Sequence, residues 1–228
     1  MAEMTGGQAL VQSLKREGVD VIFALPGVQL DWAFDALHEE RDSIRVIHTR
    51  HEQATSYMAD GYARSTGKIG VCMMVPGPGL LNAGAGLATA YSASSPVLAI
   101  CGQISSDLIG KERGALHEIK NQLDMVGSVT KWAARPMSAS DVPGAVREAF
   151  VQLTSGRPRP VEVEIPPDVL MTGQDVLLSE PGIEPRLSGD PDLLERAAQA
   201  LGQAKAPVIF AGGGIVSADA TRELQDLA

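Results

Sequence analysis

The sequence predicts an α/β protein whose parallel sheet is flanked by helices. Short apolar runs alternate with helical segments along most of the chain, which implies a parallel sheet with right-handed crossovers. The runs are almost continuously apolar, as in strands that are covered on both faces. The composition agrees, because 44% hydrophobic residues, 24 glycines and only 4% aromatic residues suit a tightly packed α/β sheet better than an aromatic-rich sandwich.

The chain begins with a helix and a buried strand. Thr5 is placed to cap a helix that ends near Gly18 and carries its apolar residues on one face. The strand over residues 19–25 follows and is broken by Pro26 and Gly27. Further strands are expected near residues 44–48, 71–75, 96–102, 129–134 and 160–166, with helices over 31–39, 52–64, 80–91 and, capped by Asp141, 141–153.

Two later segments have patterns of their own. Residues 105–120 are rich in charge and poor in periodicity, so we expect a loop with a short helix over a cleft. In residues 160–166 valine alternates with glutamate, which predicts an edge strand or a half-exposed face.

The pattern also divides the chain into domains. Residues 1–170 form the first domain, and the glycines, prolines and serines of 171–190 indicate a linker. Residues 191–228 then predict a helix, a strand over 207–211, a glycine turn at 212–214 and a second helix. One strand between two helices cannot close a core, so we expect a truncated second α/β domain, or one that another chain completes.

Charge and composition exclude several function classes. The formal net charge is −9 without a Lys/Arg cluster, which argues against nucleic-acid binding. No apolar run is long enough to span a bilayer and no signal peptide is visible, so we expect a cytoplasmic protein without membrane contact. Cys72 and Cys101 lie in predicted buried strands and are interpreted as core residues. No His/Cys/Asp set has metal-site spacing, so no metal ligand is predicted.

Two strand-to-helix turns indicate a binding cleft. Glu52 stands where the strand at 44–48 gives way to a helix, and Pro76, Gly77 and Gly79 follow the strand at 71–75. In open α/β sheets, ligands bind at this edge. Glu52 is therefore the leading catalytic candidate; the alternative is that its charge only stabilises the first turn of the helix.

The glycine turn also raises the question of a dinucleotide. Gly77 and Gly79 lie in a strand-to-helix turn of the kind that binds anions. However, Asn82 stands where a dinucleotide motif needs its third glycine, and the next strand ends at Gly102 and Gln103 without an acid for a ribose. The pattern disfavours a nicotinamide-binding module.

Four ordered motifs carry a resemblance. They are His-Glu-Gln-Ala at 51–54, Met-Ala-Asp-Gly-Tyr-Ala-Arg at 58–64, Gly-Pro-Gly at 77–79 and Asn-Ala-Gly at 82–84. Together they resemble the thiamine-diphosphate-dependent decarboxylases and carboligases, most closely the acetolactate synthase (acetohydroxyacid synthase) large subunit. The likeness covers the pyrimidine-binding domain of that family, roughly residues 5–169, and the opening of the next domain.

The resemblance implies a role for each turn. In this family the glutamate at the position of Glu52 hydrogen-bonds N1′ of the aminopyrimidine of thiamine diphosphate and so activates the cofactor. The chemistry needs a side chain that can share a proton, which glutamine could not transfer. Asn82 would either orient the start of its helix or cap it. The implied cofactor-binding residues are Pro26, Gly27, Glu52, Pro76, Gly77, Gly79 and Asn82.

The implied substrate pocket contains Val28, Gln29, Leu116 and His117. An apolar residue at Val28 fits a carboligase better than the decarboxylases that carry an acid or a serine there. Leu116 and His117 align with the Phe-Gln that acetolactate synthases usually show. His117 either donates to a substrate oxygen or is a solvent-exposed loop histidine.

The resemblance also implies partners. Active sites of the family form between chains, and its Gly-Asp-Gly segment, which binds diphosphate and Mg²⁺, does not occur here. We therefore expect a second copy of the chain, or a subunit with the diphosphate-binding domain, to supply these ligands. The small residues of 83–90 serve either tight packing on the chain's own sheet or a subunit interface. The turn at 212–214 matches where relatives bind FAD, which we do not expect here without the rest of that domain.

The implied reaction is decarboxylation of a small 2-oxo acid, followed by ligation or transfer of the acyl unit. Pro167 replaces a usual lysine, and Leu116 and His117 also depart from the acetolactate synthase pattern. Two alternatives therefore stay open: a 2-oxo acid or oxalyl-CoA-type decarboxylase, and a non-catalytic assembly subunit of such an enzyme.

Overall fold

The computed structural model describes residues 1–182 and 188–228, which form two compact units, 1–184 and 185–228. Residues 183–187 of the expected linker lie outside the described residues. The start of that linker is ordered secondary structure. Its strand β8 (Gly173–Val176) pairs antiparallel with β1 (Ala2–Thr5), which opens the sequence of the first unit. The sequence pattern indicated neither of these short strands.

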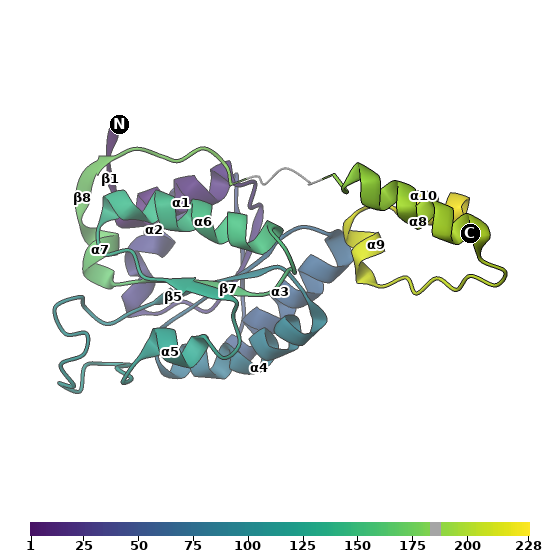
Figure 1. The fold of residues 1–228 in the computed structure, drawn as a ribbon. Helices are drawn as coiled ribbons and strands as arrows, with labels where there is room; N and C mark the ends of the chain where they lie inside the picture. The colour runs from purple at the N-terminus through teal and green to yellow at the C-terminus, as the bar shows by residue number, and fades with distance from the viewer. Residues whose placement is uncertain (183–187) are drawn as a thin grey trace. The chain divides into compact units, whose positions relative to one another are not determined.

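A parallel sheet of six strands forms the centre of the first unit, in the order β3-β2-β4-β5-β7-β6 (Figure 1). All six strands expected in this unit are therefore confirmed. Their bounds are β2 Val21–Ala24, β3 Arg45–His48, β4 Gly70–Met74, β5 Val97–Gly102, β6 Trp132–Ala134 and β7 Val161–Ile165.

Helices cover both faces of this sheet (Figure 1). One face carries α1 (Gly6–Arg16), α2 (Asp31–Glu39), α6 (Val142–Thr154) and α7 (Pro167–Met171). The other carries α3 (Glu52–Thr66), α4 (Pro78–Ala93) and the short α5 (Gln122–Val126). Two 3-10 turns, η1 (Val28–Leu30) and η2 (Ala139–Asp141), precede α2 and α6.

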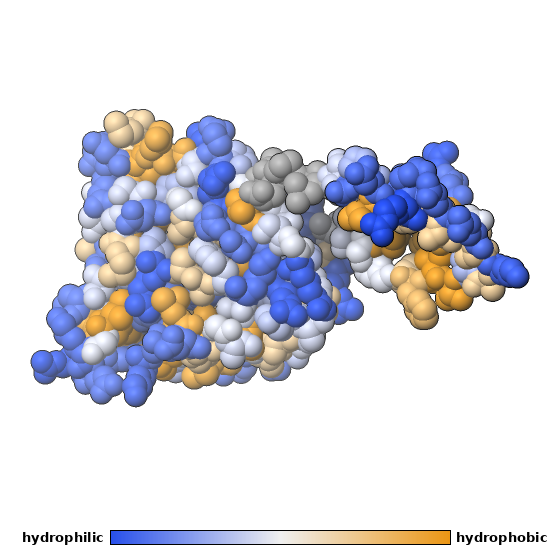
Figure 2. All heavy atoms as spheres, in the orientation of Figure 1, coloured by the Kyte–Doolittle hydropathy of each residue, from blue (hydrophilic) through white to orange (hydrophobic). Residues whose placement is uncertain are grey.

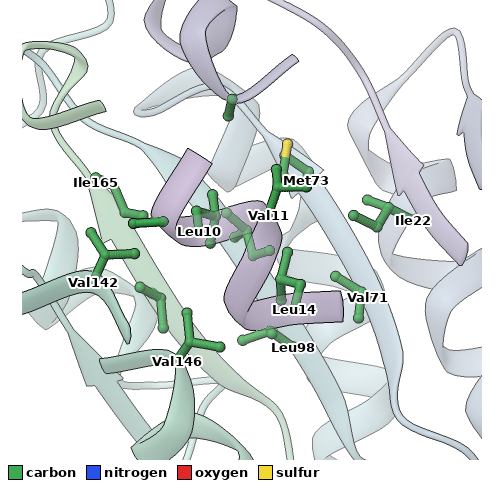
Figure 3. Close-up of a cluster of buried hydrophobic side chains, with 14 of the residues drawn as sticks. Leu10, Val11, Leu14, Ile22, Val71, Met73, Leu98, Val142, Val146 and Ile165 are labelled. Atoms are coloured by element: carbon green, nitrogen blue, oxygen red, sulfur yellow. The ribbon is translucent and has the colours of Figure 1, made fainter. Parts of the chain in front are cut away.

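Each face of the sheet has its own hydrophobic core. Under α1 and α6, Leu10, Leu14 and Val146 pack on sheet residues such as Met73 and Leu98 (Figure 3). Under α3 and α4 the core is built from smaller side chains, and both cysteines, Cys72 and Cys101, are buried in it as expected. Burial raises the pKa of the Cys72 thiol to about 12, so this residue is an inert core side chain.

The helix ends show which local signals were sufficient. Thr5 caps α1 as expected: its Oγ1 accepts from the Gln8 N–H at 3.2 Å, and Gln8 Oε1 accepts from the Thr5 N–H at 3.1 Å. Asp141 precedes α6, but its carboxylate accepts from the Ser138 hydroxyl at 2.6 Å and makes no capping bond to the helix.

The expectation of an edge strand at 160–166 was wrong. Strand β7 lies between β5 and β6, and every one of its residues is buried. Its valines enter the core under α6, while Glu162 and Glu164 point to the opposite face with no exposed surface. Neither glutamate of the alternation meets solvent: Glu164 pairs with Arg135 inside the protein, and Glu162 is buried without a hydrogen-bond partner.

The loop over 105–120 contains turns but no helix, in contrast to the expectation. The nearest helix, α5, begins just after it at Gln122. The start of the loop is attached to α7, where Asp168 accepts from the Ser106 N–H at 2.8 Å.

The second unit consists of α8 (Pro191–Gln203), α9 (Gly213–Ser217) and α10 (Thr221–Leu227). The strand expected at 207–211 is not formed, because the described residues of this unit, 188–228, contain no other strand with which it could pair. The helix expected after Gly214 is divided into α9 and α10. None of the three helices has a buried residue, and hydrophobic side chains lie on the surface of the unit (Figure 2). Among the described helices, none combines the length and the apolar character needed to cross a membrane.

Candidate functional site

The site lies at the point where the strand order of the sheet reverses direction. Strand β2 is followed by β3 on one side, whereas β4, its other neighbour, is followed by β5 on the opposite side. The turns that leave β2 and β4 are in contact, since a Cβ built on Gly27 would stand 2.3 Å from Val75 Cγ1. In open α/β sheets such a switch point, at the carboxyl ends of the strands, is where ligands bind.

Glu52 occupies the first position of α3 beside this point. His51 is the N-cap of that helix, and its Nδ1 accepts from the Gln53 N–H at 3.2 Å. The half-buried Glu52 carboxylate accepts at Oε2 from Asn82 Nδ2 at 2.9 Å. Its Oε1 lies 3.5 Å from where a Cβ on Gly79 would stand, and that Cβ would also meet Val75 Cγ2 at 2.7 Å, so the acid lies close against the glycine turn.

The contact that Asn82 makes matches neither of the two roles expected for it. Gly77 is the N-cap of α4 and makes no side-chain capping bond, and Asn82 lies on the exposed surface of the first turns of the helix. Its side-chain amide donates to Glu52 and makes no capping hydrogen bond to the start of α4. Asn82 therefore orients the carboxylate, a pairing across 30 residues that the sequence pattern did not indicate.

Gly77 joins the turn after β4 to the loop over 105–120. Its φ of +56° is in the left-handed region, and a Cβ there would stand 2.2 Å from the His117 carbonyl oxygen. Its N–H donates to Gln122 Oε1 at 2.9 Å. Only glycine fits this position without displacing the loop backbone.

The expected substrate residues come together from two segments, after β2 and in the loop over 105–120. Gln29 Nε2 donates to the Leu116 carbonyl at 3.1 Å, while Gln29 Oε1 is buried without a hydrogen-bond partner. Val28 and Leu116 expose their apolar side chains, 61% and 64% respectively. The structure thus brings residues from two distant segments to one rim.

His117 is not a freely exposed loop histidine. It is half-buried, adopts a φ of +70°, and its Nδ1 is covered and has no hydrogen-bond partner. A non-glycine residue in this backbone region is uncommon and costs roughly 1–3 kcal/mol. The surrounding loop therefore positions this imidazole at a specific place beside the Gly77 turn.

A buried polar network behind the turn was missed by the sequence analysis. Gln122 Nε2 donates to Glu164 Oε2 at 2.6 Å and to the Gly102 carbonyl at 3.0 Å. Arg135 forms an ion pair with the same Glu164 carboxylate. The repeated glutamate in β7 was the available signal, but it was interpreted as an exposed strand face.

Glu162 lies next to this network without joining it. Neither of its carboxylate oxygens has a hydrogen-bond partner, and the side chain has no exposed surface. Burial, with a smaller contribution from the neighbouring Glu164 charge, raises the pKa of Glu162 well above its usual range, although the Arg135 charge acts in the opposite direction. Burial therefore favours the protonated form of Glu162 in the folded protein.

The helix of small residues packs closely on its neighbour. A Cβ on Gly86 would stand 2.2 Å from Ser56 Oγ on α3, and that hydroxyl donates to the Ala83 carbonyl at 2.8 Å. Close packing within the chain is thus one reason for the small residues. The exposed side of the helix pair carries Tyr57, Met58 and Leu81, which are 41%, 39% and 53% exposed.

Chemically, the site offers one carboxylate, which Asn82 holds at Oε2, beside the glycine turn of residues 77–79. Its other oxygen can accept a hydrogen bond from a bound molecule. Among the residues that the structure describes, no group of three or more His, Cys, Asp or Glu side chains could bind a metal ion.

Comparison with known proteins gives results that agree with this geometry. Residues 4–125 match the family described as thiamine pyrophosphate enzyme, N-terminal TPP binding domain. A probable acetolactate synthase large subunit of Methanocaldococcus jannaschii is 38% identical over 99% of this chain, and the acetolactate synthase large subunit of Haemophilus influenzae is 38% identical over 98%. An acetolactate synthase of Arthrospira platensis is 39% identical over 98% of the chain. The chain spans 38%, 39% and 40% of the lengths of these three relatives.

Proposed function

Because the chain belongs to the thiamine pyrophosphate enzymes and carries their N-terminal TPP binding domain, we propose that its cleft binds the pyrimidine half of thiamine diphosphate. Glu52 is then the residue that activates the cofactor. The observation that supports this most directly is the position of its carboxylate, which accepts from Asn82 at Oε2 and lies beside the Gly79 backbone at Oε1.

The residues of the cleft fit an aminopyrimidine. A Cβ on Gly77 would meet the His117 carbonyl oxygen at 2.2 Å, and one on Gly79 would meet Val75 Cγ2 at 2.7 Å, so both glycines let the turn pack closely on its neighbours. Gly27 also packs on Val75, beside Pro26 and Pro76. The unpartnered Gln29 Oε1 at the rim is an acceptor for a donor group of a bound molecule. A ring with a polar edge satisfies the carboxylate while its face packs on the glycines.

When bound, thiamine diphosphate supplies the carbon nucleophile and the electron sink for cleavage of a 2-oxo acid. The protein's part in this domain is to hold a proton at the ring nitrogen through Glu52. Asn82 leaves Oε1 as the oxygen directed at the ring, because Oε2 is already engaged. Val28, Gln29, Leu116 and His117 form the substrate side of the pocket.

The proposed reaction is an acetolactate synthase-like decarboxylation of a small 2-oxo acid, followed by ligation or transfer of the acyl unit. Its support is the 38–39% identity to proteins that carry this name, together with the apolar Val28. The diphosphate and Mg²⁺ would be bound by residues outside this segment, on a second copy of the chain or another subunit. We do not propose FAD as a cofactor of this segment.

One observation favours a decarboxylase as the second candidate. His117 stands where acetolactate synthases usually have glutamine, and its Nδ1 is covered and unpartnered. An imidazole can act as a proton donor, and protonation in place of ligation would release an aldehyde. Product analysis with pyruvate and other small 2-oxo acids distinguishes the two reactions.

The test is the variant Glu52→Gln in the complete protein, assayed with thiamine diphosphate, Mg²⁺ and 2-oxo acids. Turnover should fall by roughly 100-fold or more, since the acid can no longer share a proton. The melting temperature should stay unchanged, because the amide still accepts from Asn82. Glu148→Gln on α6, on the opposite face of the sheet, is the matched control and should keep full activity. Full turnover in Glu52→Gln would refute the role.

A further inference from the structure

Gln122 connects the core of the sheet to the proposed cofactor turn. It is the first residue of α5, is only 1% exposed, and directly follows the loop that contains Leu116 and His117. Its Oε1 accepts from the Gly77 N–H at 2.9 Å. Its Nε2 donates to the Gly102 carbonyl on β5 and to Glu164 on β7, at 3.0 and 2.6 Å.

Only one orientation of this amide satisfies its partners. Turning it by half a rotation would place the NH₂ group against the Gly77 N–H and the carbonyl oxygen against the Glu164 carboxylate. The first contact opposes two donors and the second opposes two acceptors. The Glu164 carboxylate is itself fixed by Arg135 and by Gln103 Nε2, which donates to its Oε1 at 3.2 Å. The acceptor presented to Gly77 is therefore set by a buried ion pair.

The position of Gly77 determines the first turn of α4. The Gly77 carbonyl accepts from the Leu81 N–H at 3.0 Å, and the Pro76 carbonyl accepts from the Gly79 N–H at 3.2 Å. Asn82 follows directly and contacts Glu52. A shift at Gly77 would thus move both the glycine that faces Glu52 and the amide that orients it.

We propose that Gln122 is a positioning residue for the cofactor turn, fixed by the Glu164–Arg135 pair. It holds the Gly77 peptide in place, and with it the alignment of Asn82 and Glu52. Because Gly77 also contacts the His117 backbone, Gln122 sets the spacing between the cofactor wall and the substrate loop. This inference rests on the proposed function, since the ligand of the turn is thiamine diphosphate.

The test compares Gln122→Met with Gln103→Met. Both replace a buried amide by an apolar side chain of similar length and both remove a donor from Glu164, but only the first removes the acceptor of Gly77. In the full chain, amide hydrogen exchange of the peptide covering residues 75–82 should become about tenfold faster in Gln122→Met. It should not change in Gln103→Met.

Cofactor binding gives the second measurement. In the complete protein, the Kd for thiamine diphosphate with Mg²⁺ should rise about tenfold in Gln122→Met and stay unchanged in Gln103→Met. If Gln122→Met does not fold, Gln122→Glu replaces it. When protonated, this variant accepts from Gly77 and donates to Glu164, so its affinity should recover as the pH falls.

The outcomes separate the two proposals. If the unaltered protein does not bind thiamine diphosphate, the proposed function fails, whereas the exchange data still report on the hydrogen bond. If the unaltered protein binds and Gln122→Met binds equally well, or if the Gly77 segment stays equally protected, the positioning role is overturned. Equal losses in both glutamine variants would also overturn it, because they would indicate general loosening around Glu164.

Discussion

Asn82 donates to Glu52 at 2.9 Å and thereby joins the first turns of α3 and α4, the helices that follow β3 and β4. Under the proposed function, the contact has a direct consequence for catalysis. It fixes one oxygen of the carboxylate by a side chain of the same domain and leaves the other oxygen, which lies beside Gly79, for the cofactor.

We therefore expect Asn82→Ala to reduce turnover of the complete enzyme by about tenfold through the loss of one charge-assisted hydrogen bond. Asn82 is exposed, so the free energy of unfolding should change by less than about 0.5 kcal/mol. Steady-state kinetics and urea unfolding check both parts. Wild-type kcat in this variant would show that Glu52 needs no orienting partner.

Gly77→Ala should destabilise the first unit by about 2–4 kcal/mol, because the added methyl group meets the His117 carbonyl and the φ of +56° is unfavourable for alanine. Gly67→Ala is the matched control: its φ is +73° and nothing lies within 4 Å of the new Cβ. Gly67→Ala should lower the free energy of unfolding by only about 1 kcal/mol. Denaturant unfolding of both variants measures the difference, and similar losses would contradict the close contact at Gly77.

Gly86→Ala and Gly84→Ala test the packing of α4 on α3. A methyl group on Gly86 would overlap Ser56, whereas Gly84 has open space around its Cβ position. The first substitution should destabilise by about 1–3 kcal/mol, and the second should stabilise by up to about 1 kcal/mol through helix propensity. Thermal unfolding of the two variants distinguishes these signs. Should a second copy cover this face, Gly84→Ala would weaken the assembly instead, as light scattering would show.

Glu162 should make stability depend on pH. Its pKa is raised in the folded state above the usual 4.5, so folding favours the protonated acid. The stability that this acid contributes is complete below about pH 4.5 and is lost as the pH rises toward the folded-state pKa.

Glu162→Gln cannot ionise and should remove this loss. Relative to the wild type, the free energy of unfolding of the variant should increase by up to about 1.4 kcal/mol for each pH unit above about pH 4.5, until the folded-state pKa of Glu162 is reached. Urea unfolding between about pH 5 and 8 measures the slope, with Glu148→Gln as control. Parallel pH profiles for wild type and Glu162→Gln would contradict a neutral buried acid.

The order of strands and helices in the first unit could be predicted from local patterns alone. Apolar runs gave all six sheet strands, and the Thr5 capping box marked the start of α1 correctly. The same patterns failed where strand pairing decides the outcome. Strands β1 and β8 lie far apart in the sequence and form because the fold brings them side by side. Residues 207–211 stay irregular because no described residue of the second unit forms a strand beside them. Local sequence carries no information about such distant neighbours.

For the candidate site, the sequence by itself determined the residue types and their places at the ends of strands: a glutamate opening α3, glycines in the turn before α4, and the loop that carries His117. Only the tertiary structure decided that Asn82 contacts Glu52 and that Gly77 lies against the His117 backbone. The same holds for Gln122, which connects Gly77 to Glu164. The reason is physical. A strand or a helix start follows from interactions between near neighbours in the chain, whereas a buried carboxylate is tolerated only where packing brings a cation and donors to it from other elements.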